Sequence, residues 1–225
     1  MSTPLETVEV EPETAADAAV VLMHGLGADG HDFESIVPEL RLAPERAVRW
    51  VFPHAPVRPV TINGGARMRA WYDVAGFDRD AGEDEPGIRE SAQAIRALVE
   101  REKQRGVRAE RIVLAGFSQG GAMALHTALR EPERLAGVIA LSAYLPLADR
   151  LERERHPANA AVPMFMAHGT WDNVVPLALA ERTRDGLLGH GYEVEWHAYP
   201  IPHSVCAEEL DALRDWLLRV LPARR

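Results

Sequence analysis

One serine of the chain has a sequence context that suits nucleophilic catalysis. Ser118 is the centre of Gly116-Phe117-Ser118-Gln119-Gly120, which follows the apolar run 111–115 and precedes the helix-compatible segment 121–129. A strand, a sharp turn and a helix in this order are typical of a nucleophile elbow, whose glycines let the two backbones approach closely while the serine Oγ stays accessible. We therefore predict that Ser118 is a nucleophile. Because the chain has 17 glycines, a chance match is the alternative.

A serine hydroxyl is a weak nucleophile unless a base and an orienting acid accompany it. In hydrolases built on an elbow, the acid and then a histidine follow the serine, each in a loop after a strand. Asp172 comes after the apolar run 162–167, and His203 comes after the strand-like run 194–199. We predict that Asp172 and His203 complete a catalytic triad with Ser118.

The segment 24–30 contains a literal G-x-G-x-x-G, which has two interpretations. In a dinucleotide-binding fold the glycines open a helix, and an acid after the next strand binds the ribose. Here the next predicted strand, 48–52, is followed by Pro53 and His54, with no acid. We favour the second interpretation, a His-Gly-x-Gly loop that supplies an oxyanion donor. The predicted donors are the backbone N–H groups of Leu26 and Gln119.

Short apolar runs alternate with amphipathic segments along the whole chain. We predict strands at 6–11, 18–23, 48–52, 111–115, 135–141, 162–167 and 194–199, and helices from about Asp32 and at 88–103, 121–129, 176–188 and 207–221. Such alternation indicates an α/β fold with a mostly parallel central sheet flanked by helices. Length alone would permit two small domains, but no linker or repeat interrupts the pattern, so we expect a single domain over 1–225.

The segment 53–87 contains many glycines and prolines and shows little periodicity, which is typical of either a disordered segment or a functional cover loop. Its first half is apolar, and we expect it to line a substrate cleft together with the residues after strand 135–141. Its second half, 78–85, is acidic and is expected to form a mobile, exposed rim. For the aromatic residues, core filling is an equally good interpretation. The predicted lining residues are Ile62, Met68, Trp71, Tyr72, Tyr144 and Leu145.

The composition is that of an ordinary globular protein, with 47% hydrophobic and 26% charged residues. A net charge of −9 disfavours nucleic acid as a partner, because phosphate backbones are bound by basic surfaces. Residues 1–19 lack the basic region of a secretory signal, and no apolar run approaches the roughly 20 residues of a membrane-spanning helix. The single cysteine, Cys206, fits a reducing compartment, so we expect a cytoplasmic location.

The histidines and the cysteine do not form the pattern of a metal site. The nine histidines include no H-x-x-x-H pair, and one cysteine cannot provide the paired thiolates of a zinc site. His126 and His168 are expected to pack or to form hydrogen bonds. We therefore predict no metal ligands in this chain.

Five separated motifs resemble one known family, and the likeness runs nearly end to end. The motifs are 23–30, 53–65, 71–73, 116–122 and 199–205. They are similar to those of the small carboxylesterases and acyl-protein thioesterases. The resemblance implies an α/β-hydrolase fold without a large cap domain, a small-molecule ester substrate and no cofactor, and it allows a homodimer. It also assigns the family's triad to Ser118, Asp172 and His203, and its oxyanion donors to Leu26 and Gln119.

The resemblance leads us to expect a serine carboxylesterase that cleaves neutral esters of short to medium acyl chains through an acyl-enzyme. An acyl-protein thioesterase or a lysophospholipase with the same triad is the alternative. A non-catalytic binding module on the same fold is disfavoured, because such modules typically lose a triad member and none is missing here. The chain departs from the family at Pro202, where a small residue is usual before His203. This departure bears on how the histidine loop is held.

Overall fold

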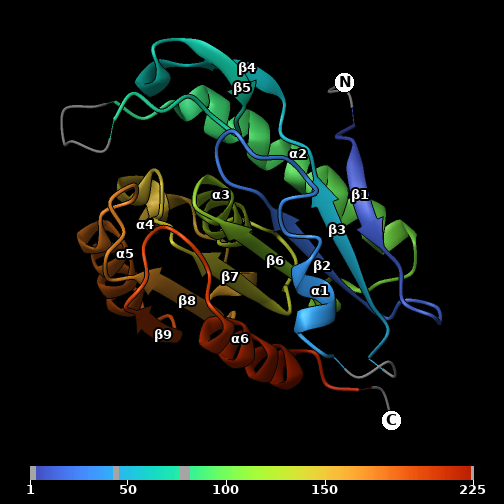
Figure 1. The fold of residues 1–225 in the computed structure, drawn as a ribbon. Helices are drawn as coiled ribbons and strands as arrows, with labels where there is room; N and C mark the ends of the chain where they lie inside the picture. Colours follow the sequence, from blue (N-terminus) through green and yellow to red (C-terminus); the bar gives the residue numbers. More distant parts are fainter. Residues whose placement is uncertain (1–3, 43–45, 77–81, 224–225) are drawn as a thin grey trace.

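The computed structural model describes residues 4–42, 46–76 and 82–223, and its centre is a seven-stranded sheet in the order β1-β3-β2-β6-β7-β8-β9 (Figure 1). Strand β1 pairs antiparallel with β3, and the other pairs in this sheet are parallel. The strands are β1 (Thr7–Val10), β2 (Ala18–Met23), β3 (Val48–Pro53), β6 (Ile112–Phe117), β7 (Gly137–Leu141), β8 (Met164–Gly169) and β9 (Val194–Tyr199). The predicted mostly parallel sheet is confirmed.

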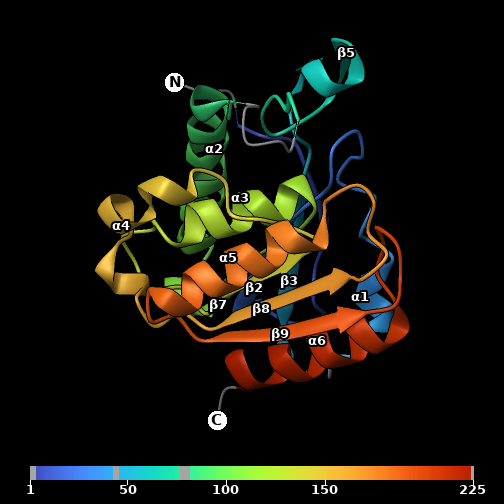
Figure 2. The same cartoon turned by 90° about the vertical axis from the view of Figure 1, so that its left-hand side faces the viewer.

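Helices cover both faces of this sheet (Figures 1 and 2). The α-helices are α1 (Ile36–Glu39), α2 (Glu85–Gln104), α3 (Gln119–Ala128), α4 (Leu151–Glu154), α5 (Leu177–Gly189) and α6 (Ala207–Val220). One apolar cluster joins α2 and α3 to the sheet, and a second joins α1 and α6 to its other face. This is the α/β-hydrolase arrangement, and the described residues include no large cap domain. Within those residues, none of the helices is both long and apolar enough to cross a membrane.

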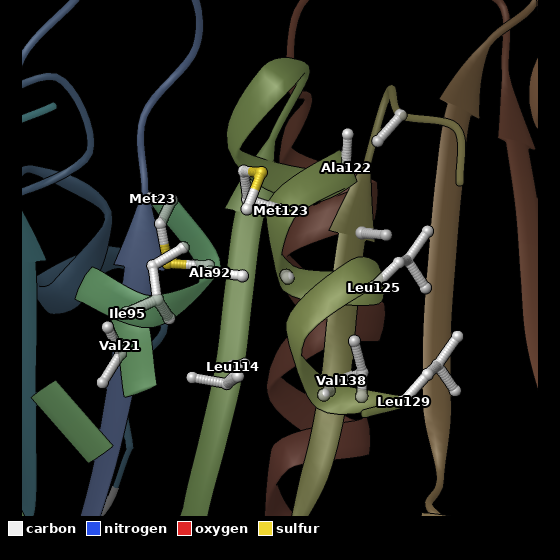
Figure 3. Packing of buried hydrophobic residues seen from close by; sticks show 14 of the residues in the cluster. Val21, Met23, Ala92, Ile95, Leu114, Ala122, Met123, Leu125, Leu129 and Val138 are labelled. Carbon is white, nitrogen blue, oxygen red and sulfur yellow. The ribbon is translucent and has the colours of Figure 1, made fainter. Parts of the chain in front are cut away.

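Strand β2 shows why the sheet is buried on both faces. Successive side chains of a strand point to opposite faces, so Val21 and Met23 contribute to the cluster under α2 and α3, whereas Val20 and Leu22 contribute to the cluster under α6. Figure 3 shows Val21 and Met23 beside Ile95 of α2. The parallel pairing of β2 with β6 places Met23 opposite Gly116. The carboxyl ends of β2 and β6, and the loops that follow them, therefore lie side by side.

The segment 53–87 is more regular than the sequence suggested. Strands β4 (Val57–Val60) and β5 (Ala66–Arg69) form a separate antiparallel hairpin, which lies beyond the end of the main sheet in Figure 1. The prediction of an irregular first half is therefore wrong. The missed signal is Asn63-Gly64-Gly65 in the connection between these strands, where Gly64 and Gly65 have φ values of 65° and 80°.

The acidic second half of this segment is only partly described, because residues 77–81 of the predicted mobile rim lie outside the described residues. Asp84 is the N-cap of α2 and accepts hydrogen bonds from the backbone N–H groups of Gly87 (3.0 Å) and Asp73 (2.9 Å). Helix α2 consequently begins at Glu85, three residues earlier than predicted. Asp84 and Glu85 therefore belong to an ordered helix start and not to a mobile rim.

The helix predicted from about Asp32 is also corrected. Only Ile36–Glu39 is helical, and the preceding residues form turns. Pro38 lacks a backbone N–H and disfavours helical geometry in the residue before it, so a longer helix here would be strained. Phe33, Ile36 and Leu40 are nevertheless buried against the sheet, as expected.

Glu209 in the first turn of α6 gives a testable pH dependence, because this residue is only 2% exposed. This burial raises the pKa of Glu209 to about 8, from 4.5 for an ordinary glutamate. The folded protein therefore binds this proton more tightly than the unfolded chain, and the free energy of unfolding must fall as pH rises from 4.5 towards 8. Between pH 6 and pH 8.5 we expect wild type to lose about 2 to 3 kcal/mol more than Glu209→Gln, measured by urea unfolding.

The neighbouring Glu208 provides a matched control for this prediction. Its side chain is exposed in the same helical turn, so Glu208→Gln should keep the wild-type pH dependence. Equal losses of stability in wild type and Glu209→Gln would show that the Glu209 carboxyl group does not retain its proton in the folded protein.

Candidate active site

Ser118 occupies a strained turn between β6 and α3. Its φ of 54° and ψ of −121° lie outside the regions that non-glycine residues usually adopt. The turn is possible because Gly116 and Gly120 have no Cβ. A Cβ at Gly116 would overlap the backbone of Gly120, and a Cβ at Gly120 would overlap the backbone of Met23. The Ser118 N–H donates to the Leu141 carbonyl at 2.8 Å, which ties the turn to β7. The predicted elbow geometry is thus present.

Asp172 follows β8 and is held by a turn of its own loop. Its Oδ1 accepts hydrogen bonds from the backbone N–H groups of Val174 and Val175, each at 2.9 Å. Its Oδ2 accepts from His203 Nδ1 at 2.6 Å, and the carboxylate is fully buried. All of these contacts favour one fixed orientation of the carboxylate towards His203.

The loop that carries His203 is joined to the loop that carries Asp172 by backbone contacts. Thr170 N–H donates to the Tyr199 carbonyl at 2.7 Å, and Trp171 N–H donates to the Ile201 carbonyl at 3.1 Å. The Pro202 carbonyl accepts from Ser204 N–H at 2.8 Å. Proline therefore fits this loop, since the contacts that hold the loop use carbonyl groups and not the N–H that Pro202 lacks.

The imidazole of His203 also lies beside the elbow. Its ring centroid is 4.6 Å from that of Phe117, the residue immediately before Ser118. Because the Nδ1–H is directed to Asp172, the neutral ring carries its lone pair on Nε2, which is the tautomer that a general base requires. The structure thus brings Asp172 and His203 into direct contact. Both follow the carboxyl ends of parallel strands, at the same edge of the sheet as Ser118.

The two residues that were predicted to supply the oxyanion donors line the same cavity as Ser118. Leu26, Ser118 and Gln119 all contribute to its wall. The Leu26 loop is held by His24, whose Nε2 accepts from Ala55 N–H at 3.0 Å and whose Nδ1 contacts the Gly25 carbonyl at 2.7 Å. Burial lowers the pKa of His24 to about 4. His24 is therefore a neutral, structural residue at physiological pH.

The cavity has a volume of about 130 Å³ and a mostly apolar wall. It is lined by Leu26, Ile62, Asn63, Tyr72, Val74, Ser118, Gln119, Tyr144, Val174 and Val175. Ile62, Tyr72 and Tyr144 were predicted to line a cleft, and they do line this one. The sequence analysis missed four lining residues, which are Asn63, Val74, Val174 and Val175. Each lies within three residues of a predicted site residue, and this closeness was the signal that could have identified them.

Three predicted lining residues are not in the wall of this cavity. Trp71 is 0% exposed in the core under α2 and α3, so the prediction that it contacts substrate is wrong. Leu145 is buried in the same core cluster. Met68 lies in β5, where its Sδ accepts a hydrogen bond from the Asn63 amide at 3.1 Å. Both Trp71 and Tyr72 belong to that core cluster, but only Tyr72 also contributes to the wall of the cavity.

A pair of tyrosines closes one side of the cavity. The hydroxyl groups of Tyr72 and Tyr144 are 2.9 Å apart and share a hydrogen bond. Burial raises the pKa of Tyr144 to about 12 and raises that of Tyr72 well above its usual value. Both phenols are therefore neutral at physiological pH, and this wall carries no charge that would oppose an apolar chain.

His168, at the end of β8, lies close to Asp172. Its Nε2 is 2.9 Å from the Val175 carbonyl and 3.4 Å from Asp172 Oδ2. Burial lowers its pKa, so the ring is neutral and supports the Asp172 loop, in line with its expected structural role.

Two features of the described residues bear on metal and dinucleotide binding. Among those residues, no three or more His, Cys, Asp or Glu side chains gather in a way that could hold a metal ion. The glycines of 25–30 lead into turns, and the first helix begins only at Ile36. The segment therefore lacks the helix N-terminus that binds a dinucleotide pyrophosphate.

The chain is similar to known proteins of one family. The phospholipase/carboxylesterase family model matches residues 5–221. The chain is 42% identical to acyl-protein thioesterase 1 of Neurospora crassa over 214 residues, which cover 91% of this chain and 87% of that protein. The solved structure of Arabidopsis thaliana SOBER1 has a TM-score of 0.86 at 31% identity, covering 91% of this chain and 99% of that one. Acyl-protein thioesterase 2 of Zea mays also has a TM-score of 0.86 at 31% identity, covering 96% and 99%.

Proposed function

Because the chain belongs to the phospholipase/carboxylesterase family and is therefore a hydrolase of esters or thioesters, we propose that it works through a Ser118-His203-Asp172 triad. The observation that carries the proposal is the 2.6 Å contact between His203 Nδ1 and Asp172 Oδ2, at the strand end that bears the Ser118 elbow. A buried carboxylate in this position fixes the imidazole tautomer and stabilises the imidazolium that forms during the reaction.

The proposed reaction has two halves. Ser118 Oγ attacks the substrate carbonyl carbon while its proton passes to His203 Nε2, and the carbonyl oxygen becomes an oxyanion. Backbone N–H groups of Leu26 and Gln119 donate to that oxyanion. The intermediate then expels the alcohol or thiol, which takes the proton from His203. Water attacks the acyl-enzyme in the same way, with His203 as base, and releases the acid and Ser118.

The proposed substrate is a neutral ester of a short to medium acyl chain. The cavity of about 130 Å³ supports this choice, because it is small and its wall is largely apolar. Each methylene that it buries contributes about 0.8 kcal/mol. The net charge of −9 should also slow the approach of anionic substrates at low salt.

A thioester is the second candidate substrate, and the similarity to the acyl-protein thioesterases favours it. The same triad and oxyanion donors serve both reactions, since only the leaving group differs. Matched oxyester and thioester series with acyl chains from acetyl to palmitoyl would separate the two. The candidate with the higher kcat/KM at equal chain length is the better description of the enzyme.

Ile62 at the cavity wall offers a test of where the acyl chain binds. Its side chain is 46% exposed, so Ile62→Ala should leave the fold intact while removing apolar contact with longer chains. We expect kcat/KM for hexanoyl esters to fall about 3- to 10-fold, and that for acetyl esters to change less than about twofold.

Val57 is a matched control for this test. It is 50% exposed in the adjoining strand β4 and is not part of the cavity wall. Val57→Ala should therefore keep the wild-type chain-length profile. If Ile62→Ala also keeps that profile, the acyl chain does not bind in this cavity.

A further inference from the structure

The polar groups of Trp71 join the segments that contain His24 and Gln119 to each other and to helix α2. Its indole Nε1–H donates to the His24 carbonyl at 2.9 Å, and its backbone N–H donates to Gln119 Oε1 at 2.8 Å. Its own carbonyl accepts from the Ser91 hydroxyl of α2. Buried polar groups need hydrogen-bond partners wherever they lie, and here the partners of the Trp71 N–H groups are the His24 carbonyl and the Gln119 side chain.

The Gln119 side chain completes the connection. Its Nε2 donates to the Tyr72 carbonyl at 2.8 Å. One carboxamide therefore bonds the backbone N–H of Trp71 and the backbone carbonyl of Tyr72. Gln119 is buried, as are both ends of these hydrogen bonds. Buried hydrogen bonds without competing water fix geometry more strictly than exposed ones.

The two joined segments are those that carry the oxyanion donors. His24 is two residues before Leu26, and Gln119 is itself the second donor. We propose that Trp71 and the Gln119 side chain are positioning residues that set the separation and direction of the Leu26 and Gln119 backbone N–H groups. This inference rests on the proposed serine-hydrolase mechanism. Such donors stabilise the transition state only when they are aimed at the place where the oxyanion forms, so their supports should affect the rate more than substrate binding.

The variant Trp71→Phe tests this role, because phenylalanine keeps an aromatic ring and the backbone contacts but removes the hydrogen bond to His24. We expect kcat for a short neutral ester to fall about 10- to 100-fold with KM within about twofold, since a small misplacement of catalytic groups costs on this order. The inhibition constant of a trifluoromethyl ketone, which forms an oxyanion on attack by serine, should rise by a similar factor. The loss should be equal for acetyl and hexanoyl esters.

Trp216 provides the matched control. It is a buried tryptophan of α6 that packs against Phe165 on the other face of the sheet. Trp216→Phe should lower the melting temperature at least as much as Trp71→Phe while leaving kcat within about twofold. If Trp71→Phe does not fold, Gln119→Met replaces it, because methionine keeps the side-chain length and the backbone N–H but removes both carboxamide hydrogen bonds.

Two results would overturn the inference. One is a kcat and a trifluoromethyl ketone affinity within twofold of wild type in the folded variant. The other is a loss of kcat that Trp216→Phe reproduces. Failure of the proposed mechanism is a separate outcome, because it would appear as undiminished turnover in a Ser118 variant, whereas failure of this inference alone leaves turnover dependent on Ser118.

Discussion

Replacement of Ser118 by alanine is expected to abolish labelling by a fluorophosphonate probe and to lower kcat by roughly 10⁶. The variant removes the oxygen that attacks the substrate carbonyl in the first half of the proposed mechanism, while the cavity and the donors that surround it remain. Labelling is measured by intact-protein mass, and turnover is measured with an activated aryl ester at saturating concentration.

Ser142 gives a control with a similar backbone. It follows β7, the strand next to β6, and has a φ of 48°, close to the 54° of Ser118. Ser142→Ala should retain labelling and turnover, which would show that alanine at a positive φ is not itself the cause of inactivity. Normal turnover in Ser118→Ala would remove Ser118 from the mechanism.

Replacement of Asp172 by asparagine is expected to lower kcat by about 10⁴ without unfolding the protein. An amide at this position no longer provides the carboxylate that accepts the His203 Nδ1–H, so the imidazole adopts the wrong tautomer and its cation is not stabilised. The turnover of Asp172→Asn is compared with wild type, and the melting temperature reports on folding.

Asp149 serves as the comparison residue for this second prediction. Its carboxylate is 74% exposed and interacts with the neighbouring Arg150, so Asp149→Asn should retain wild-type turnover. An essential Asp149 together with a dispensable Asp172 would mean that the acid has been assigned to the wrong loop.

The positions of the three proposed triad residues in the fold could be predicted from the sequence, because each residue is tied to a local signal. The elbow depends on Gly116 and Gly120, whose lack of side chains is visible in the sequence, and Asp172 and His203 each follow a strand that its apolar residues identify. Helix α2 also carried a local signal, since Asp84 and Pro86 are typical of a helix start. That signal was present, although the predicted helix began three residues too late.

The wall of the cavity could not be predicted in the same way, because it depends on contacts between distant segments. Trp71 and Tyr72 have the same aromatic character and adjacent positions, yet only Tyr72 reaches the cavity. The difference arises from the hydrogen bonds of this dipeptide to His24 and Gln119, which are 47 or more residues away in the chain. No periodicity within the segment itself reports such partners.

The backbone contacts between the Asp172 and His203 loops divide the proposed machinery into two mechanical units. The acid and the histidine share one unit at the β8–β9 edge of the sheet, whereas Ser118 and the oxyanion donors belong to the interior strands β2 and β6. A distortion of the sheet edge would therefore move the imidazole and its carboxylate together. The distance from His203 to Ser118 would change first, and the enzyme would lose activity while its acid and base were still paired.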